Sequence, residues 1–271
     1  VILERRPYMG GTWCQNSYPG AAVDVHSPLY SISSEPYPWT QMFAEQDELR
    51  EYTEHVIDKH RMRDKTELDA DVCDLSWDDH EHVWTVTTRD GRRFRGRFVI
   101  LGSGPLSTPK IPDFPGRDTF EGHTFHSNGW DHDYDLAGKK VAVVGSGASA
   151  AQIIPAIAPE VGELHVFQRT PHWVMPRPDR RFTSIERRLL ANRYAYAALR
   201  GLIYLSLETR VIGFKYSRRM LEKVAQTAAV RHIEDQIDDP ELRRKVAVLD
   251  AVPRAVPRQR DASRRRRRHR R

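Results

Sequence analysis

A glycine-rich turn at residues 145–150 carries the clearest chemical signal in the sequence. It reads Gly-Ser-Gly-Ala-Ser-Ala, directly after the strand-like run 139–144 and directly before the helix-compatible run 151–157. In such a turn the first glycine permits a sharp bend, the second lets the backbone approach a pyrophosphate, and a small third residue, here Ala150, allows the helix to pack closely on the strand. The positive end of the helix favours the anion. We therefore expect a dinucleotide to bind here; the alternative is a glycine turn without a ligand.

The end of the following strand indicates which dinucleotide binds. Residues 163–167 form a second strand-like run, and Gln168, Arg169 and Thr170 follow it. An NAD site usually places a carboxylate at this point to bond the 2′-hydroxyl of the ribose, whereas an arginine and a hydroxyl suit a 2′-phosphate. The sequence therefore favours NADPH over NADH. The alternative is that Arg169 is only a surface arginine at the end of a strand.

Glu4 indicates a second nucleotide site. It ends the apolar run Val1–Glu4, which we expect to be a buried strand, and a glycine turn follows at Gly10 and Gly11. A Rossmann domain keeps at this place the acid that bonds an adenosine ribose. The matching glycine fingerprint is then expected upstream of Val1. Taken alone, a glutamate at the end of a strand is more often only solvated.

The elements around these residues predict an α/β protein. Residues 1–134 alternate short strand-like runs with Gly/Pro turns, and residues 135–245 hold the strand–turn–helix signal and then long helical stretches. Residues 246–271 are mostly Arg, Val, Ala and Pro without a sustained period. Hydrophobic periodicity and turn residues predict a helix at 44–60, a hairpin of strands 83–88 and 93–101 around Asp90 and Gly91, and a helix that begins at the capping box Thr183–Glu186 and continues with breaks to about 245.

Composition and charge exclude several classes of protein. The 271 residues carry a net charge of +6, but residues 246–271 alone carry +8, so the first 245 residues sum to −2 and the basic character belongs to the tail. Two cysteines, Cys14 and Cys73, cannot form a disulfide framework and lack metal-ligand spacing, so we expect no metal site. No apolar run reaches about 18 residues, so we expect no membrane span and a cytoplasmic location.

Residues 120–131 resemble a family fingerprint. Phe120, Gly122, His126, Trp130 and Asp131 fit F-x-G-x-x-x-H-x-x-x-W-[PD]. This is the fingerprint of the Baeyer–Villiger monooxygenases, within the class B flavin monooxygenases; N- and S-oxygenating relatives carry a similar motif, usually without the Trp-Asp ending. The flanks are also similar to the family, at the flavin-side stretch 10–30, the crossover 102–112 and the strand and loop 166–173. The resemblance runs from about residue 1 to residue 245.

The resemblance implies two Rossmann-like dinucleotide-binding domains, one for FAD and one for NADP, with a helical insert. It implies an enzyme in which NADPH reduces the flavin, and O2 then forms a flavin peroxide that inserts one oxygen atom into a ketone or oxygenates a soft nitrogen or sulfur. It divides the chain into a partial FAD-binding domain with crossover and fingerprint at 1–134, an NADP-binding domain with the helical insert at 135–245, and a disordered basic tail at 246–271.

The resemblance also implies roles for individual residues. Asp24 would lie beside the flavin, and His126 and Trp130 would belong to a hinge-like segment that couples NADP position to catalysis. The alternatives are a turn-capping carboxylate, a structural histidine bonded to backbone, and simple packing, respectively. The expected FAD contacts are Glu4, Gly10, Gly11, Thr12, Trp13, Cys14, Gln15, Asp24, Tyr30 and Val72. The expected NADPH contacts are Gly145, Ser146, Gly147, Ala148, Ser149, Ala150, Ala151, Arg169 and Thr170.

The chain departs from the family pattern at Ala22 and Val23, where many members have an arginine, and at both ends. The flavin phosphate loop, the closing strand of the FAD domain and a Lys-Arg pair expected shortly after Lys245 are missing from the sequence. We therefore expect an incomplete fold with open sheet edges, weak or no flavin binding and little turnover by this chain. The resemblance stops at Val246, where residues with GC-rich codons begin, and this suggests a frameshift near codon 245.

Two other classes of function remain open. Residues 139–170 are an intact nucleotide-binding module, so the chain could be a stand-alone NADPH-binding remnant. The arginine run 264–268 could bind nucleic acid or another polyanion, nonspecifically through its charge. Binding of NADPH without FAD would favour the first class. Salt-sensitive nucleic-acid binding that is lost with residues 246–271 would identify the tail.

Overall fold

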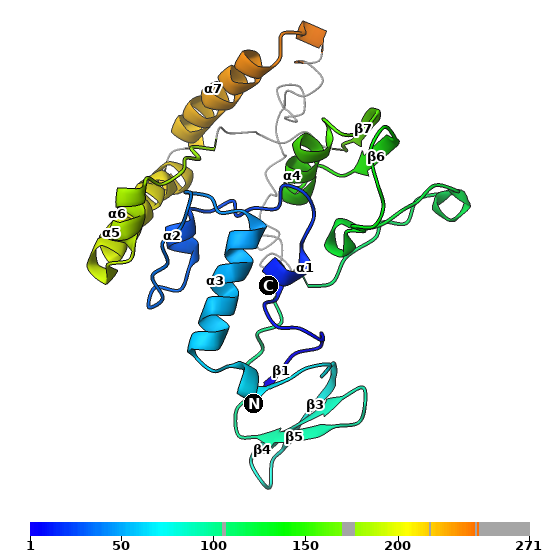
Figure 1. The fold of residues 1–271 in the computed structure, drawn as a ribbon, viewed down its shortest axis with the longest axis vertical. Helices are drawn as coiled ribbons and strands as arrows, with labels where there is room; N and C mark the ends of the chain where they lie inside the picture. Colours follow the sequence, from blue (N-terminus) through cyan, green and yellow to red (C-terminus); the bar gives the residue numbers. More distant parts are fainter. Residues whose placement is uncertain (105–106, 170–176, 217, 242, 244–271) are drawn as a thin grey trace, which may run out of the picture. The chain divides into compact units, whose positions relative to one another are not determined.

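A computed structural model describes residues 1–104, 107–169, 177–216, 218–241 and 243 (Figure 1). These residues form two compact units. The first contains Val1–Val143, Gly147–His165 and Asp179–Glu208, and the second contains the described residues of Val144–Ser146, Val166–Pro178 and Thr209–Arg271. Thr170 and the predicted tail at 246–271 lie outside the described residues. The domain boundary near residue 134 stays a prediction.

The first unit begins with a parallel pair of two-residue strands. β1 (Ile2–Leu3) pairs with β2 (Thr66–Glu67), Ile2 opposite Thr66. The strand predicted at Val1–Glu4 is confirmed, but the prediction that this strand is buried is wrong, because Val1 is 79% exposed. The reason is that β2 is the only strand paired with β1 among the described residues.

Three helices lie between these strands. α1 (Thr12–Gln15) and α2 (Ser27–Tyr30) are single turns, and α3 (Gln46–Lys59) confirms the helix predicted at 44–60. α3 buries Leu49, Tyr52, Val56 and Ile57, whose spacing forms one helical face. Acidic residues in its first turn and Lys59 in its last complement the helix dipole. A 3₁₀ turn, η1 (Arg63–Lys65), then leads into β2.

A three-stranded antiparallel sheet follows, in the order β3 (Val72–Asp78), β4 (Val83–Thr88) and β5 (Arg93–Gly96). The hairpin predicted around Asp90 and Gly91 is confirmed, and Gly91 has the positive φ, 87°, that its turn requires. The predicted extension to residue 101 is wrong, because β5 ends at Gly96. Residues 97–101 pair with no strand among the described residues, and Ile100 is 93% exposed.

Two further 3₁₀ turns, η2 (Arg117–Thr119) and η3 (Ser127–Gly129), lead to a β–α–β motif of β6 (Lys140–Val144), α4 (Ala148–Ile157) and β7 (Glu163–Phe167). The N–H of Glu163 donates to the Lys139 carbonyl at 3.1 Å, and that of Gly145 donates to the Phe167 carbonyl at 2.9 Å. The first bond joins the start of β6 to the start of β7, and the second joins the end of β6 to the end of β7. The two strands therefore run parallel, and α4 is their crossover helix. The strand–turn–helix prediction is confirmed.

The remaining described elements are helices. α5 (Ser184–Leu190) begins at Thr183, whose hydroxyl accepts from the Glu186 N–H while the Glu186 carboxylate accepts from the Thr183 N–H, which confirms the predicted capping box. α6 (Arg193–Tyr216) and α7 (Arg218–Gln236) continue the chain. No helix among the described residues is both long enough and apolar enough to span a bilayer.

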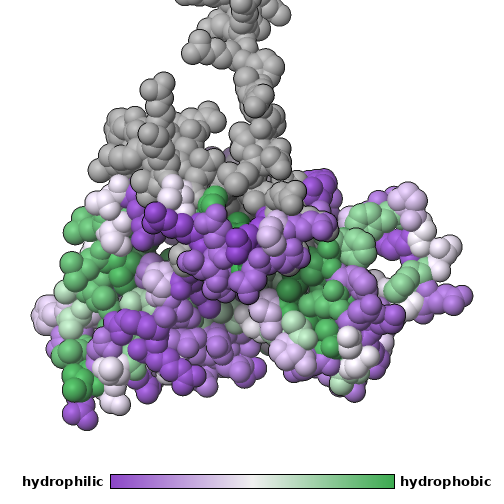
Figure 2. Space-filling model, turned by 90° about the horizontal axis from the view of Figure 1, so that it is seen from above, coloured by the Kyte–Doolittle hydropathy of each residue, from purple (hydrophilic) through white to green (hydrophobic). Residues whose placement is uncertain are grey.

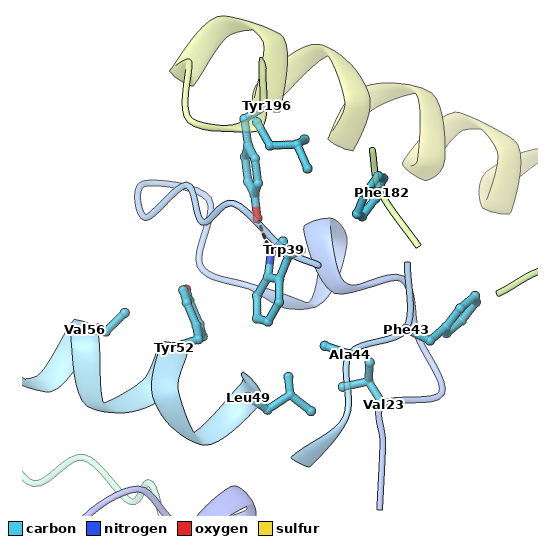
Figure 3. Close-up of a cluster of buried hydrophobic side chains, with 10 residues drawn as sticks. Val23, Trp39, Phe43, Ala44, Leu49, Tyr52, Val56, Phe182 and Tyr196 are labelled. Atoms are coloured by element: carbon cyan, nitrogen blue, oxygen red, sulfur yellow. Dashed lines mark hydrogen bonds between the residues drawn. The ribbon is translucent and has the colours of Figure 1, made fainter. Parts of the chain in front are cut away.

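The main core of the first unit surrounds Trp39, which is fully buried (Figure 3). Its indole N–H donates to the Tyr196 hydroxyl at 3.0 Å, and its ring lies 5.0 Å from that of Tyr52. Arg200 of α6 donates to the carbonyls of Leu29 at 3.2 Å and Ser31 at 2.8 Å, at the end of α2. The first part of α6 therefore holds α2, the helix that carries Tyr30, in place.

Large apolar side chains also remain on the surface, where green areas adjoin purple ones on the face drawn in Figure 2. Phe98 is 82% exposed and Leu101 75% exposed, and the described strands do not cover them. An exposed apolar run of this kind favours association with other apolar surface.

Candidate nucleotide-binding site

The glycine turn has the backbone geometry that an anion site requires. Gly145 has φ of 126°, a conformation that residues with a side chain rarely adopt, and a Cβ at Gly145 or Gly147 would meet no atom within 4 Å. Gly147 is the N-cap of α4 and provides no side-chain cap. The first N–H groups of α4 are therefore left for an anion or water, and Ala150 is buried as the third small residue.

The hydrogen bond from Gly145 to Phe167 ties this turn to the end of β7. Arg169 is exposed and comes two residues after the strand. Thr170, the other residue expected at the 2′-phosphate, lies outside the described residues. The structure thus brings the predicted turn beside the strand end from which Arg169 follows.

α4 also docks onto the flavin-side stretch, within the first unit. The Gln152 side chain accepts from the Tyr18 hydroxyl and donates to the Ala22 carbonyl, both at 2.9 Å. Gly20 has φ of 78°, and a Cβ there would lie 2.6 Å from the Gln152 carbonyl oxygen. Tyr18 and Ala21 pack against Ile153 and Ile157 of α4. This contact was not predicted, because Gln152 lies after the glycine motif and carries no signal of its own.

Glu4 lies half-buried in the wall of a cavity of about 310 Å³. One carboxylate oxygen accepts the Arg6 N–H at 3.0 Å, and the Glu4 backbone continues the pairing with β2 through Glu67 at 3.0 Å. The rest of the cavity wall is mostly apolar and includes Ile2, Met9, Gly10, Tyr52, Val56 and Ile57. A carboxylate at the edge of an apolar cavity can bond a ribose hydroxyl while the cavity takes an apolar ring.

The predicted flavin contacts on α1 lie close together. Gly10 and Gly11 have φ of 111° and 55°, and a Cβ on Gly10 would collide with the Cys14 sulfur. Burial raises the pKa of the Cys14 thiol, and Glu54 adds to this shift. The Trp13 indole donates to the Tyr30 hydroxyl at 3.1 Å, so two predicted contacts touch each other.

The other predicted flavin-side residues are more scattered. Thr12 begins α1 and is exposed, Asp24 is exposed directly after the buried Ala22 and Val23, and Val72 is exposed at the start of β3. The structure therefore places Trp13 and Tyr30 together but records no contact that joins Asp24 or Val72 to them.

The fingerprint segment, residues 120–131, contains an ordered set of contacts. His126 Nδ1 accepts from the N–H of Asn128 at 3.1 Å, so the neutral imidazole carries its proton on Nε2. Trp130 meets the Phe125 ring edge-on at 5.0 Å and packs against the cluster that contains Ile153. His123 pairs with Asp131 at 2.8 Å.

The same segment is bonded to the flavin-side stretch. Asn128 Nδ2 donates to Oδ1 of Asn16 at 3.0 Å, and the Gln15 side chain donates to the Asn128 carbonyl. Nearby, Ser17 and His132 are joined at 2.7 Å. Asn128 and His132 were not predicted as site residues, because one occupies a variable position of the fingerprint and the other lies beyond it.

Comparisons with known proteins show the family to which the chain belongs. Residues 37–256 match the family model described as L-lysine 6-monooxygenase/L-ornithine 5-monooxygenase. The chain therefore belongs to the flavin-dependent monooxygenase family. A Baeyer–Villiger monooxygenase of Pseudomonas aeruginosa is 46% identical over 248 residues, which are 91% of this chain and 47% of the relative. The chain thus spans about half the length of this curated relative.

Solved structures place the fold in the same group. The OTEMO complex with FAD and NADP superimposes with a TM-score of 0.77 at 27% identity, covering 90% of this chain and 54% of the other. Cyclohexanone monooxygenase with ε-caprolactone bound gives 0.77 at 28% identity, covering 91% and 56%. The predicted family and the predicted α/β, Rossmann-type fold are confirmed.

Proposed function

We propose that these residues belong to an NADPH- and FAD-dependent monooxygenase of the Baeyer–Villiger type, which inserts one oxygen atom of O2 into a ketone. The observation that carries this proposal is the docking of α4, with its N-terminus uncapped by any side chain, onto the flavin-side stretch through Gln152. The helix proposed to bind NADPH at its N-terminus thus contacts the stretch proposed to bind the flavin, through Tyr18 and Ala22.

NADPH would lie with its pyrophosphate at the first turn of α4. The N–H groups from Gly147 to Ala150 and the positive end of the helix favour the anion, and Gly145 and Ser146 form the turn that approaches it. The N–H of Ala151 donates to the Gly147 carbonyl, so Ala151 would only line the site. Arg169 and Thr170 would bond the 2′-phosphate by charge-assisted hydrogen bonds.

FAD would contact the stretch from Glu4 to Val72. Glu4 fits an adenosine ribose, because its carboxylate lies in the wall of a mostly apolar cavity. Gly10, Gly11, Thr12, Trp13, Asp24 and Tyr30 would line the rest. Cys14 and Gln15 would contribute backbone atoms. The Cys14 side chain packs against Gly10, and the Gln15 side chain forms hydrogen bonds with Tyr8 and Asn128.

Bound FAD would supply the redox chemistry, accepting hydride from NADPH and activating O2. The residues of this chain would place the two cofactors and exclude water. Asp24 would stand beside the flavin, His126 would offer its Nε2–H as a donor, and Trp130 would hold the fingerprint against α4.

A second candidate is oxygenation of nitrogen or sulfur. The matching family model is described by two monooxygenases that act on amino acids, lysine and ornithine. The Trp130-Asp131 ending of the fingerprint and the name of the 46% identical relative favour the ketone reaction.

A cytoplasmic location and nonspecific binding of nucleic acid by the arginine tail belong to the proposal as well.

The test is the choice of cofactor by the 271-residue chain. Fluorescence titration should show NADPH binding at least about tenfold tighter than NADH, a difference typical of a charge-assisted phosphate contact. Arg169→Ala should remove most of this preference. Gly145→Val should abolish binding, whereas Gly201→Ala, in open space on α6, should not. Equal affinity for NADPH and NADH would contradict the assignment of Arg169. Full binding by Gly145→Val would contradict the site at α4 and point to the arginine tail.

The reaction itself is tested by supplying FAD, NADPH and a cyclic ketone. Because the chain spans about half the length of its relative, we expect little turnover from these 271 residues alone. Lactone formation would establish the reaction class and overturn the expectation of weak turnover. A parallel reaction supplies an amine in place of the ketone. Hydroxylation of the amine, without lactone formation from the ketone, would favour the second candidate.

A further inference from the structure

α2 is a single helical turn that carries Tyr30 at its last position. So short a helix is not stable in water by itself, so tertiary contacts must fix this turn. The start of α2 is held by the loop before α3, because the Ser27 N–H donates to the Met42 carbonyl and the Ser27 hydroxyl accepts from the Ala44 N–H, both at 2.7 Å. These bonds reach only Ser27, so the position of Tyr30 depends on what holds the other end.

The end of α2 is held by α6. Arg200 Nη1 donates to the carbonyls of Leu29 at 3.2 Å and Ser31 at 2.8 Å, and it also donates to the carbonyl of Pro28. Tyr196, one helical turn before Arg200, shares a hydrogen bond with the Ser31 hydroxyl. The last carbonyls of a helix have no partner within it, and here a single nitrogen of an arginine binds three carbonyls around the end of the turn.

Tyr30 joins the end of α2 to α1. Its hydroxyl accepts the indole N–H of Trp13 at 3.1 Å, and the two rings meet edge-on with their centres 5.9 Å apart. Tyr30 is 47% exposed, so its ring stays open to a ligand while its hydroxyl is bonded. A displaced end of α2 would carry Tyr30 away from Trp13, so the bonds that Arg200 makes also hold this aromatic pair together.

We propose that Arg200 is a positioning residue that holds Tyr30 against Trp13 on the flavin side of the site. The proposal rests on the proposed function, because it takes FAD as the ligand of this aromatic pair. Arg200 acts through the backbone of α2: its bonds to the carbonyls fix the turn, and the turn fixes where the Tyr30 side chain begins.

The indole N–H signal of Trp13 reports the position of Tyr30. In NMR spectra of the chain with isotope-labelled tryptophan, Trp13→Phe assigns this signal, and Tyr30→Phe shows where it lies without its acceptor. Arg200→Met, which keeps a long side chain without donors, should move the Trp13 signal most of the way to that position. Trp39 donates to Tyr196 on the same helix, and its signal should stay in place, which a general detachment of α6 would not allow.

Two further variants and a control sharpen the test. Arg200→Lys should return the Trp13 signal toward its natural position, because all three bonds come from one nitrogen and an ammonium group also carries three donors. Arg200→Gln, which stays polar but is too short, should behave like Arg200→Met and serves if that variant fails to fold. Arg187→Met is the matched control, since Arg187 also donates to a backbone carbonyl, that of Pro38 at 3.3 Å.

Titration of FAD, followed by flavin fluorescence, tests the connection to the flavin. Arg200→Met should weaken FAD binding about threefold or more, within the range of one lost hydrogen bond, and Arg200→Lys should recover part of the loss. If the natural chain binds no FAD, the flavin assignment of the proposed function fails, and the indole signals still decide whether Arg200 positions Tyr30.

A Trp13 signal that stays in place in both Arg200→Met and Arg200→Gln would overturn the proposal. Equal displacement of the Trp13 and Trp39 signals would also overturn it, because Arg200 would then only fasten α6. Unchanged FAD affinity in a variant whose Trp13 signal has moved would contradict the connection to the flavin.

Discussion

The hydroxyl of Tyr18 donates a hydrogen bond of 2.9 Å to the side chain of Gln152, across 134 positions of the sequence. The amide group of the same side chain donates to the Ala22 carbonyl. Gln152 therefore bonds α4 to one residue before Gly20 and to one residue after it. Hydride transfer between two cofactors depends on their separation to within about 1 Å. A contact that sets the position of α4 against the flavin-side stretch therefore bears directly on the proposed reaction.

Replacing Gln152 by leucine should lower the free energy of unfolding by about 1–3 kcal/mol, because the part-buried Tyr18 hydroxyl loses its acceptor. Tyr18→Phe removes that hydroxyl, so the double variant should cost less than the sum of the two single changes. Urea unfolding of the four proteins measures this. Strictly additive effects would show that the two side chains do not interact in solution.

Gly20→Ala should be more destabilising than Gly91→Ala. Both glycines have positive φ, 78° and 87°, but only the new Cβ at position 20 would meet a backbone atom, the Gln152 carbonyl at 2.6 Å, while position 91 is open. We expect an additional loss of about 1–3 kcal/mol from the clash. The measurement is the free energy of unfolding of each variant, and equal losses would place α4 away from Gly20.

Acid should weaken the start of α5 through Glu186. Its pKa is lowered from 4.5 to about 2, first by the hydrogen bond from Arg180 and then by the Thr183 N–H. Since the folded-state pKa lies below the unfolded one, the contribution of this carboxylate is complete above about pH 4.5 and is lost as the pH falls to about 2. Glu186→Gln should flatten the stability profile in this window, and an unchanged profile would contradict the role of this carboxylate.

Phe98, Ile100 and Leu101 should promote self-association, because each is at least 75% exposed on a segment that follows the end of β5. Replacing all three by serine should reduce light scattering of concentrated samples without lowering the free energy of unfolding. A large loss of stability would show instead that these side chains are buried in solution.

Local patterns predicted much of the fold. The capping box at Thr183 and the strand–turn–helix motif around Gly145 follow from neighbouring residues and are confirmed. The predicted length of β5 was wrong. The sequence pattern extended the strand to residue 101, but a strand also requires a partner, and β5 ends at Gly96. Gln152, Asn128 and Arg200 were missed as structural links, since each bonds residues more than 100 positions away and no local pattern reports such a contact.

The most direct test of the nucleotide site is NMR titration of the isotope-labelled chain with NADPH. We predict that the backbone amides of Gly145–Ala151 shift first and saturate together, and that Gly145→Val removes these shifts. Shifts confined to the arginines of residues 254–271 would mean that only the charged tail binds the nucleotide, and would contradict the assignment of α4 as the NADPH-binding helix.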